Sequence, residues 1–282
     1  MSPEAPLTTT TIIQLLALAA SCLAVTDQDA GSPDSPARIL LDRLELAHDR
    51  IEGFESPLTY RKEYGLEGDF ETRIGEVSVR GEGSGRRMIL VFDRIIDVSG
   101  HGTDQPEFHM FHGGWWTEID PRRRRLVRRQ IVEPGSELDP FELGEGPLPL
   151  PFRQDPDEVE RRFEVSVGEV PGEPLFGSID DALVLHLVPR PGTAASEDHE
   201  SIDLLFDPVT LLPVGIRLMH TNGDRTTAWL RKASPLREED SSDGRIKQFD
   251  ELMNRARGES GWRIEEKPIA SRTQVPSETD PG

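Results

Sequence analysis

With 282 residues, the chain is long enough for one large domain with an extensive core. Its 52 Asp and Glu residues outnumber its 32 Lys and Arg residues, and the formal net charge of -20 excludes nucleic acid as an expected partner. The single cysteine excludes an internal disulfide bond and a zinc site built from cysteines.

Residues 1–25 are predicted to be a signal peptide. Their apolar run, Ile12–Val25, is too short to span a membrane comfortably and precedes a polar stretch, as in exported proteins. We expect the polar residues 26–35 to be a linker. Cys22 ends the motif AASC, which resembles a lipoprotein signal, so its lipidation is the alternative to its removal with the peptide. The protein is therefore predicted to be periplasmic or otherwise exported, with membrane anchoring through Cys22 as the open alternative.

A helix is expected after the linker, followed by strands. Ser35 and Pro36 are typical of a helix start, apolar residues recur at helical spacing as far as Ile51, and Gly53 is expected to end the helix. The apolar spacing then changes to two, which indicates strands. The strands expected in this part are Leu58–Leu66, Phe70–Arg80 and one around Met88–Ile95 that is apolar on both faces, followed by a polar loop at Ser99–Gln105.

Three strands and a short helix are predicted in the next stretch. Gly113-Gly114 suits a tight hairpin turn. The expected strands are Phe108–His112, Trp115–Asp120 and Leu126–Val132. A capping box at Ser136 favours a short helix at Leu138–Leu143, and the proline-rich exit GPLPLP follows as far as Phe152. We expect this insert to be a movable cover over a sheet.

Five more strands and two helices are predicted beyond the insert. Asp155-Pro156 is a helix start, and Asn222-Gly223 indicates a tight hairpin. The expected strands are Phe163–Val167, Leu183–Val188, Ile202–Phe206, Val214–His220 and Arg225–Arg231. Arg245–Arg257 has the apolar spacing of an amphipathic helix, and the tail from Pro268 is expected to be disordered.

The sequence contains little that is typical of an enzyme, a metal site or a cofactor site. It has no Gly-rich phosphate loop, no G-x-S-x-G and no H-E-x-x-H motif. His109 and His112 are expected on opposite faces of one strand, and His186 is expected in the core. Carboxylates that pair as general acid and base are an alternative, but they are expected by chance in so acidic a chain. The candidates are Asp93, Asp97, Glu118 and Asp120.

A basic block stands out against the overall acidity. It comprises Arg122–Arg125 with Arg128 and Arg129. Its arginines are expected to pair with carboxylates on adjacent strands, and contact with an anionic partner or a lipid headgroup is the alternative.

Two segments resemble the outer-membrane lipoprotein carrier family LolA, with its relative LolB. They are GGWWTEIDPRRRRLVRR and LLFDPVTLLPVGIRLMHTNGDRTTAWL, and the resemblance extends over roughly Arg38 to Lys232. The family's third-strand arginine motif has no counterpart in GRRMILVFDRII, and the C-terminal helix is no part of the family pattern. The resemblance implies an α+β, mainly β fold, in which a strongly curved antiparallel sheet forms an incomplete barrel with covering helices. A single such domain is expected over residues 36–267.

The resemblance also implies a cavity that shields acyl chains, needs no cofactor and performs no catalysis. Aromatic and aliphatic residues on the strands and the insert are its expected lining, namely Phe92, Phe111, Trp115, Trp116, Phe141, Phe206, Leu218 and Trp229. The expected lid residues are Leu40, Leu44, Leu138 and Leu143. Core packing is the alternative role for each of them.

Two functions follow from the resemblance. The first is a monomeric periplasmic carrier or receptor for lipoprotein acyl chains, with an inner-membrane donor complex and an outer-membrane acceptor as partners. The second is a sensor or protein-interaction module similar to RseB, without lipoprotein transfer. A secreted hydrolase is the third class, for which the sequence offers no nucleophile and base together.

Overall fold

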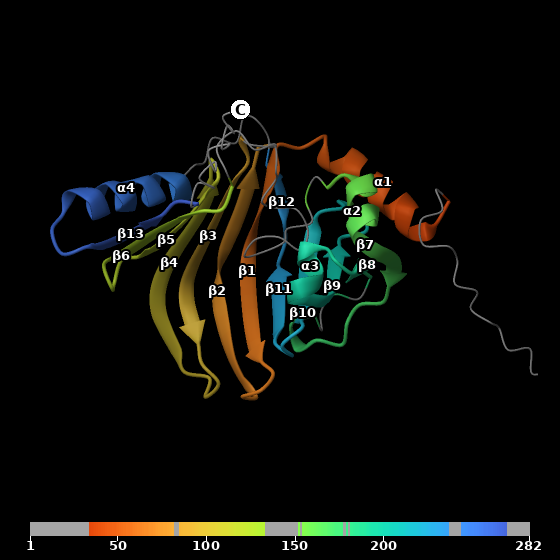
Figure 1. The fold of residues 1–282 in the computed structure, drawn as a ribbon, viewed down its shortest axis with the longest axis horizontal. Helices are drawn as coiled ribbons and strands as arrows, with labels where there is room; N and C mark the ends of the chain where they lie inside the picture. Colours follow the sequence, from red (N-terminus) through yellow and green to blue (C-terminus); the bar gives the residue numbers. More distant parts are fainter. Residues whose placement is uncertain are drawn as a thin grey trace, which may run out of the picture.

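The computed structural model describes residues 34–81, 85–132, 152, 154–176, 179, 181–236 and 244–269. In this part of the chain, 13 strands form one sheet with the order β13-β6-β5-β4-β3-β2-β1-β11-β10-β9-β8-β7, and β12 also pairs with β1. All neighbours are antiparallel except β13 and β6. The sheet is curved and its two end strands do not meet (Figure 1). The predicted fold class, a mainly β incomplete barrel with few helices, is confirmed.

The strands from β1 to β6 form a meander, and those from β7 to β11 form a second one. The first comprises β1 Gly53–Tyr64, β2 Asp69–Arg80, β3 Arg87–Ile96, β4 Gly102–His112, β5 Trp115–Asp120 and β6 Arg125–Gln130. The second comprises β7 Phe163–Gly168, β8 Leu183–Pro189, β9 His199–Phe206, β10 Pro213–His220 and β11 Arg225–Leu230. Two short strands follow, β12 Ser234–Leu236 and β13 Arg263–Lys267. The helices are α1 Pro36–His48, α2 Pro156–Arg162, α3 Ala194–Asp198 and α4 Gly244–Gly258, with a 3-10 turn, η2, at Pro174–Phe176.

Local signals account for the starts of α1 and α2. The Ser35 hydroxyl accepts a hydrogen bond from the Arg38 amide at 3.1 Å, and the Asp155 carboxylate accepts two from the first turn of α2. Gly113 and Gly114 have φ of 59° and 79°, which glycine adopts without strain. These caps and this turn confirm the sequence predictions.

Two boundary predictions were wrong. Gly53 does not end α1, which ends at His48, but begins β1, where a Cβ would lie 1.9 Å from the Val79 carbonyl oxygen. The space between β1 and β2 therefore requires glycine there. The expected loop Ser99–Gln105 is partly strand, because β4 already begins at Gly102 and pairs with the end of β3.

The two faces of the sheet differ in how their apolar side chains gather. On one face, buried residues from every strand between β1 and β11 except β6, together with residues of α1, form a single cluster. On the other face there are two separate clusters, one under α4 and one beside η2. Side chains from distant strands converge only on a concave surface, so we call the first face the inner face and the second the outer face. Figure 1 shows α4 at the β3–β6 end of the sheet and α1 with α2 at the β7–β8 end.

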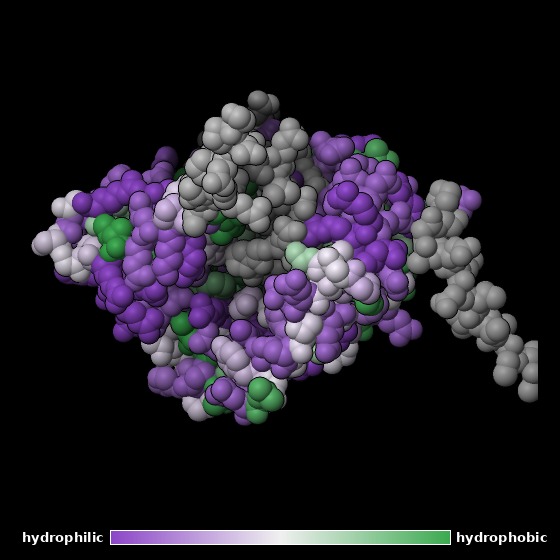
Figure 2. Space-filling view, in the orientation of Figure 1, coloured by the Kyte–Doolittle hydropathy of each residue, from purple (hydrophilic) through white to green (hydrophobic). Residues whose placement is uncertain are grey.

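Helix α4 and strand β13 form a C-terminal addition on the outer side. Phe249, Leu252 and Ala256 of α4 pack over Ile89 and Phe108, and β13 then pairs in parallel with β6. The amphipathic helix was predicted, whereas β12 and β13 were not. No helix in the described part of the chain is long and apolar enough to cross a membrane. The side seen in Figure 2 is mainly hydrophilic, and its apolar residues form small separate patches. This agrees with the many charged residues and the formal net charge of -20.

Candidate functional site: the inner face of the sheet

Five of the predicted cavity residues lie together on the inner face. They are Phe92, Phe111, Trp116, Phe206 and Leu218, and all are buried in the same cluster. The predicted lid residues Leu40 and Leu44 belong to α1 and pack into this cluster as well. Phe141, Leu138, Leu143 and Cys22 lie outside the described residues. The binding of acyl chains by any of these residues stays a prediction.

The other two predicted residues, Trp115 and Trp229, lie on the outer face. Trp115 precedes Trp116 on β5, and neighbouring residues of a strand point to opposite sides. Its ring is stacked on the Arg128 guanidinium, 4.5 Å from the ring centroid. Trp229 packs into the cluster beside η2. The eight predicted residues therefore do not share one surface, and only Trp116 of the two adjacent tryptophans faces the inner side.

The predicted cover is attached to the inner face at both of its ends. Val132, which precedes residues 133–151, packs against the inner cluster. Phe152, which follows them, is 1% exposed, and its ring centroid lies 5.4 Å from that of Phe54 and 4.8 Å from that of His48. The insert is thus tethered between β6 and α2 by two apolar contacts on the concave side.

A polar group of side chains occupies the inner face of β2, β4, β5 and β6. The Arg73 guanidinium donates a hydrogen bond to Glu107 at 2.7 Å, and Arg129 pairs with Glu118. The indole N–H of Trp116 donates to the same Glu118 carboxylate at 3.1 Å. Alternation along the strands and the antiparallel register bring these residues to one side, because His109 stands directly opposite Glu118 and Trp116 opposite Arg129.

His109 joins this polar group to the apolar part of the inner face. Its ring centroid lies 5.7 Å from those of Phe92 and Trp116, and its side chain is 16% exposed. The interaction with His109, followed by the charge of Arg73, lowers the pKa of Glu107 to about 2 although burial opposes this. Glu107 is therefore ionised at every pH at which the protein is expected to work.

A cavity of about 290 Å³ opens beside these side chains. Three arginines and three carboxylates line it together with His109, Ile119 and Val127. The charged residues are Arg73, Arg123, Arg125, Glu107, Glu118 and Asp120. The inner face thus has an apolar surface that borders a polar cavity with balanced charge. An amphiphilic ligand requires such an arrangement, with an apolar surface for its chain and polar groups for its head.

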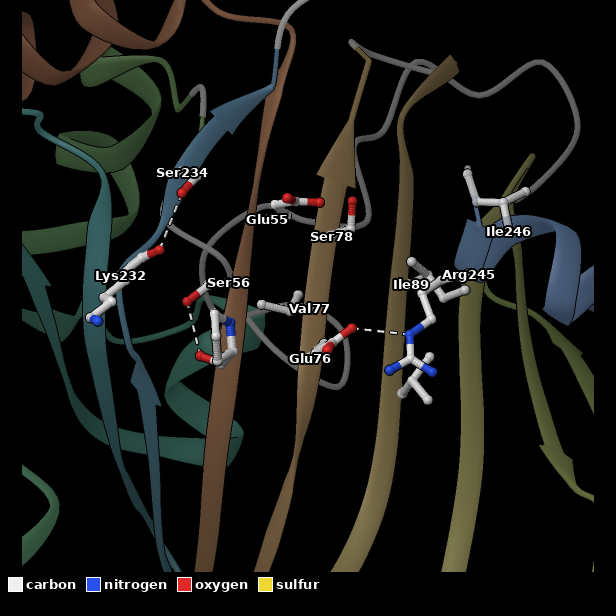
Figure 3. Close-up of a pocket in the computed structure, with 12 residues that line it drawn as sticks. Glu55, Ser56, Glu76, Val77, Ser78, Ile89, Lys232, Ser234, Arg245 and Ile246 are labelled. Carbon is white, nitrogen blue, oxygen red and sulfur yellow. Dashed lines mark hydrogen bonds and ion pairs between the residues drawn. The ribbon is translucent and has the colours of Figure 1, made fainter. Parts of the chain in front are cut away.

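A second cavity, of about 240 Å³, lies on the outer face between the start of α4 and β12 (Figure 3). Ile89 and Val91 form part of its floor, and Ile246 of α4 forms one wall. Arg245 closes this wall with a 3.0 Å hydrogen bond to Glu76, while Lys232 stands on the opposite side (Figure 3). This cavity mixes apolar and charged groups without the continuous apolar surface that the inner face has.

Four of the six arginines of the basic block pair with carboxylates, in agreement with the first of its two interpretations. Arg128 donates to Glu266 of β13 at 2.9 Å, and Arg123 lies 3.3 Å from Asp120. Arg125 lies 3.8 Å from Glu265, and Arg129 pairs with Glu118. Arg122 donates to the Asp104 carbonyl oxygen at 2.9 Å. Arg129 thus links β6 to β5, and Arg125 and Arg128 link β6 to β13.

The histidine predictions were partly wrong. His109 and His112 lie on opposite faces, as expected, since His112 lines a cavity on the outer side with Trp115. His186, however, is not in the core: its side chain is 37% exposed and its Nδ1 lies 2.7 Å from the Asp203 carboxylate. Among the residues that the structure describes, no group of three or more His, Cys, Asp or Glu side chains is arranged to hold a metal ion.

Sequence reasoning missed the roles of Arg73 and Glu107. Arg73 belongs to a strand that was predicted, and Glu107 to one that was partly predicted. The alternation of Met88, Leu90 and Phe92 shows which residues of β3 face the inner side, but it does not show which residues of β2 and β4 do so. The register between strands, which places Glu107 opposite Phe92, was the missing information.

No protein-family model matches the chain, and no curated protein matches it either. Solved structures do match. An uncharacterized conserved protein from Thermus thermophilus has a TM-score of 0.43 and 10% identity, with 82% of this chain and 99% of that chain covered. The complex of MucA and MucB from Pseudomonas aeruginosa has a TM-score of 0.36 and 18% identity, with 73% and 60% covered. A LolA superfamily protein from Nitrosomonas europaea has a TM-score of 0.30 and 10% identity, with 73% and 96% covered.

One of these structures is a LolA superfamily protein, the family that the sequence resembles. The identities are low and the three TM-scores lie below 0.5, so these likenesses do not decide what the chain does. What the chain binds has to follow from its own residues.

Proposed function

We propose that the chain is an exported carrier or receptor that binds acyl chains on the inner face of its half-open barrel. The observation that carries the proposal is the continuous apolar inner face, whose insert is tethered on the same side through Val132 and Phe152. Each methylene that an acyl chain buries contributes roughly 0.8 kcal/mol.

Lipoprotein acyl chains are the proposed ligand, because shielding them from water requires an apolar surface and no catalytic group. A donor complex in the inner membrane and an acceptor in the outer membrane are the partners that such a carrier requires. Phe92, Phe111 and Trp116 are proposed to contact the chains, and the insert is proposed to act as the lid.

The adjacent tryptophans allow a direct test. Of the four tryptophans in the chain, Trp116 is on the inner face, whereas Trp115, Trp229 and Trp262 belong to the outer side. A fatty acid brominated on its chain quenches tryptophan fluorescence only on close contact. Titration of the wild-type protein should give saturable quenching, which Trp116→Phe should abolish and Trp115→Phe should preserve.

Lipid that copurifies with the exported protein, identified by mass spectrometry, provides an independent measurement. Bound acyl chains that a fluorescent fatty acid displaces slowly are expected for a carrier. Absence of both bound lipid and quenching would refute the proposal, and so would quenching that is lost in Trp115→Phe and kept in Trp116→Phe.

The second candidate is a sensor or protein-interaction module with the same fold. The outer-face cavity between α4 and β12 favours it, because apolar Ile89 and Ile246 lie there beside Glu76, Arg245 and Lys232 (Figure 3). Apolar centres with a polar rim are typical of protein interfaces. A protein that purifies empty and takes up no lipid would favour this candidate.

A further inference from the structure

His109, which lines the polar cavity at the end of the inner face, has a ring nitrogen that lacks a hydrogen bond. The Nε2 atom of His109 is buried, and within the described residues it has no hydrogen-bond partner. The nearest carboxylate oxygen, Oε2 of Glu107, lies 3.9 Å away, close enough for the electrostatic interaction that lowers the Glu107 pKa but too far for a hydrogen bond. A buried polar atom without a partner costs about 1–3 kcal/mol, so a ligand that supplies the partner gains affinity.

His109 also has the position that a headgroup contact requires. Phe92 and Trp116, both in the apolar inner cluster, flank its ring. His109 is also one of the residues that line the cavity of about 290 Å³. An acyl chain that lies along the inner face would therefore place its polar end beside His109.

The charges around the cavity disfavour an ionised headgroup. Arg73 is bound to Glu107 at 2.7 Å, and Arg123 lies 3.3 Å from Asp120. Glu118 already accepts from Arg129 and from the Trp116 indole. The three arginines of the lining already pair with carboxylates and its charges balance, so neither an anionic nor a cationic head finds an unpaired countercharge there. An uncharged head needs only to hydrogen-bond with His109.

We propose that this cavity is a headgroup subsite that selects amphiphiles with an uncharged, hydroxyl- or ester-bearing head of about glycerol size, recognised by His109. The inference rests on the proposed binding of acyl chains. The volume agrees with it, because about 290 Å³ is near the lower end of the roughly 300–1,000 Å³ of small-molecule sites, too small for a large oligosaccharide head.

Competition against a fluorescent fatty acid tests the selectivity. The competitors are a monoacylglycerol, the free fatty acid and a lysophosphatidic acid, all with the same acyl chain. The monoacylglycerol should bind about tenfold more tightly to the wild-type protein than either anion, as one additional hydrogen bond allows. His109→Phe, which keeps a ring but removes both nitrogens, should abolish the preference, and His109→Gln, which restores an amide, should recover part of it.

His112→Phe is the matched control, since His112 lies on the same strand but faces outward. It should keep the wild-type preference. Lipids that all bind equally, or a preference that persists in His109→Phe, would overturn the headgroup subsite and leave acyl-chain binding intact. Tighter binding of an anion would overturn it too. If none of the three lipids binds, both the subsite and the proposed function fail. His109→Gln decides the matter if His109→Phe does not fold.

Discussion

Replacing Glu107 with Gln should lower the free energy of unfolding in a way that depends on pH. The Glu107 side chain is 13% exposed and bound to Arg73 at 2.7 Å. Its pKa falls from 4.5 to about 2 on folding, with the interaction with His109 as the largest cause. That difference corresponds to about 3 kcal/mol of stabilisation of the ionised carboxylate.

The sign follows from the direction of the shift. A carboxyl group whose pKa is lowered on folding stabilises the protein fully above its unfolded pKa of 4.5. The stabilisation is lost as the pH falls through the folded pKa of about 2. The wild-type protein should therefore exceed Glu107→Gln by about 3 kcal/mol at pH 7 and by about half of that at pH 3.

Urea denaturation of both proteins at several pH values measures this difference. Glu71→Gln is the matched control, because Glu71 binds the same arginine at 2.6 Å from a more exposed position. Exposed ion pairs contribute at most about 1 kcal/mol, so the control should change little. A loss in Glu107→Gln that is below about 1 kcal/mol, or that does not vary between pH 7 and pH 3, would refute the electrostatic reasoning.

Three further changes probe the packing of the fold. Gly75→Ala would place a Cβ 1.9 Å from the Val91 carbonyl oxygen, so its melting temperature should fall sharply, whereas Gly172→Ala, with nothing within 4 Å, should be neutral. Asp207→Ala removes hydrogen bonds of 3.0 and 2.7 Å to two backbone amides of its turn and should cost about 1–2 kcal/mol in urea denaturation. Phe152→Ala should cost about 3–5 kcal/mol and increase proteolysis of the insert; a smaller cost without increased cleavage would contradict the tether.

Local signals made much of the fold predictable. The caps at Ser35 and Asp155 and the turn at Gly113-Gly114 depend on residues within three or four positions of each other. The alternating apolar residues of β3 likewise gave both of its buried faces, because the pattern of a strand covered on two sides is local. Such features need no knowledge of which strands pair.

The candidate site was predictable only in part, because it depends on non-local register. Two adjacent aromatic residues, Trp115 and Trp116, look alike in sequence, and only the pairing of β5 with β4 assigns each of them to a face. The same holds for Arg73 of β2, which reaches Glu107 of β4 across the intervening strand β3. Strand β13 was missed because its charged residues resemble a solvated tail until their pairing with β6 is known.

The C-terminal segment, α4 and β13, contacts the outer side and the edge of the sheet and leaves the inner face to the proposed ligand. Strand β13 covers the β6 edge with alternating charges, and Glu266 receives hydrogen bonds from both Arg128 and Arg257. Charged residues on an edge strand discourage pairing with another chain. Helix α4 meanwhile buries Ile89 and Phe108 from the outer side. Because these contacts brace β3–β6 from outside, the sheet can keep its curvature while the inner face remains for a ligand.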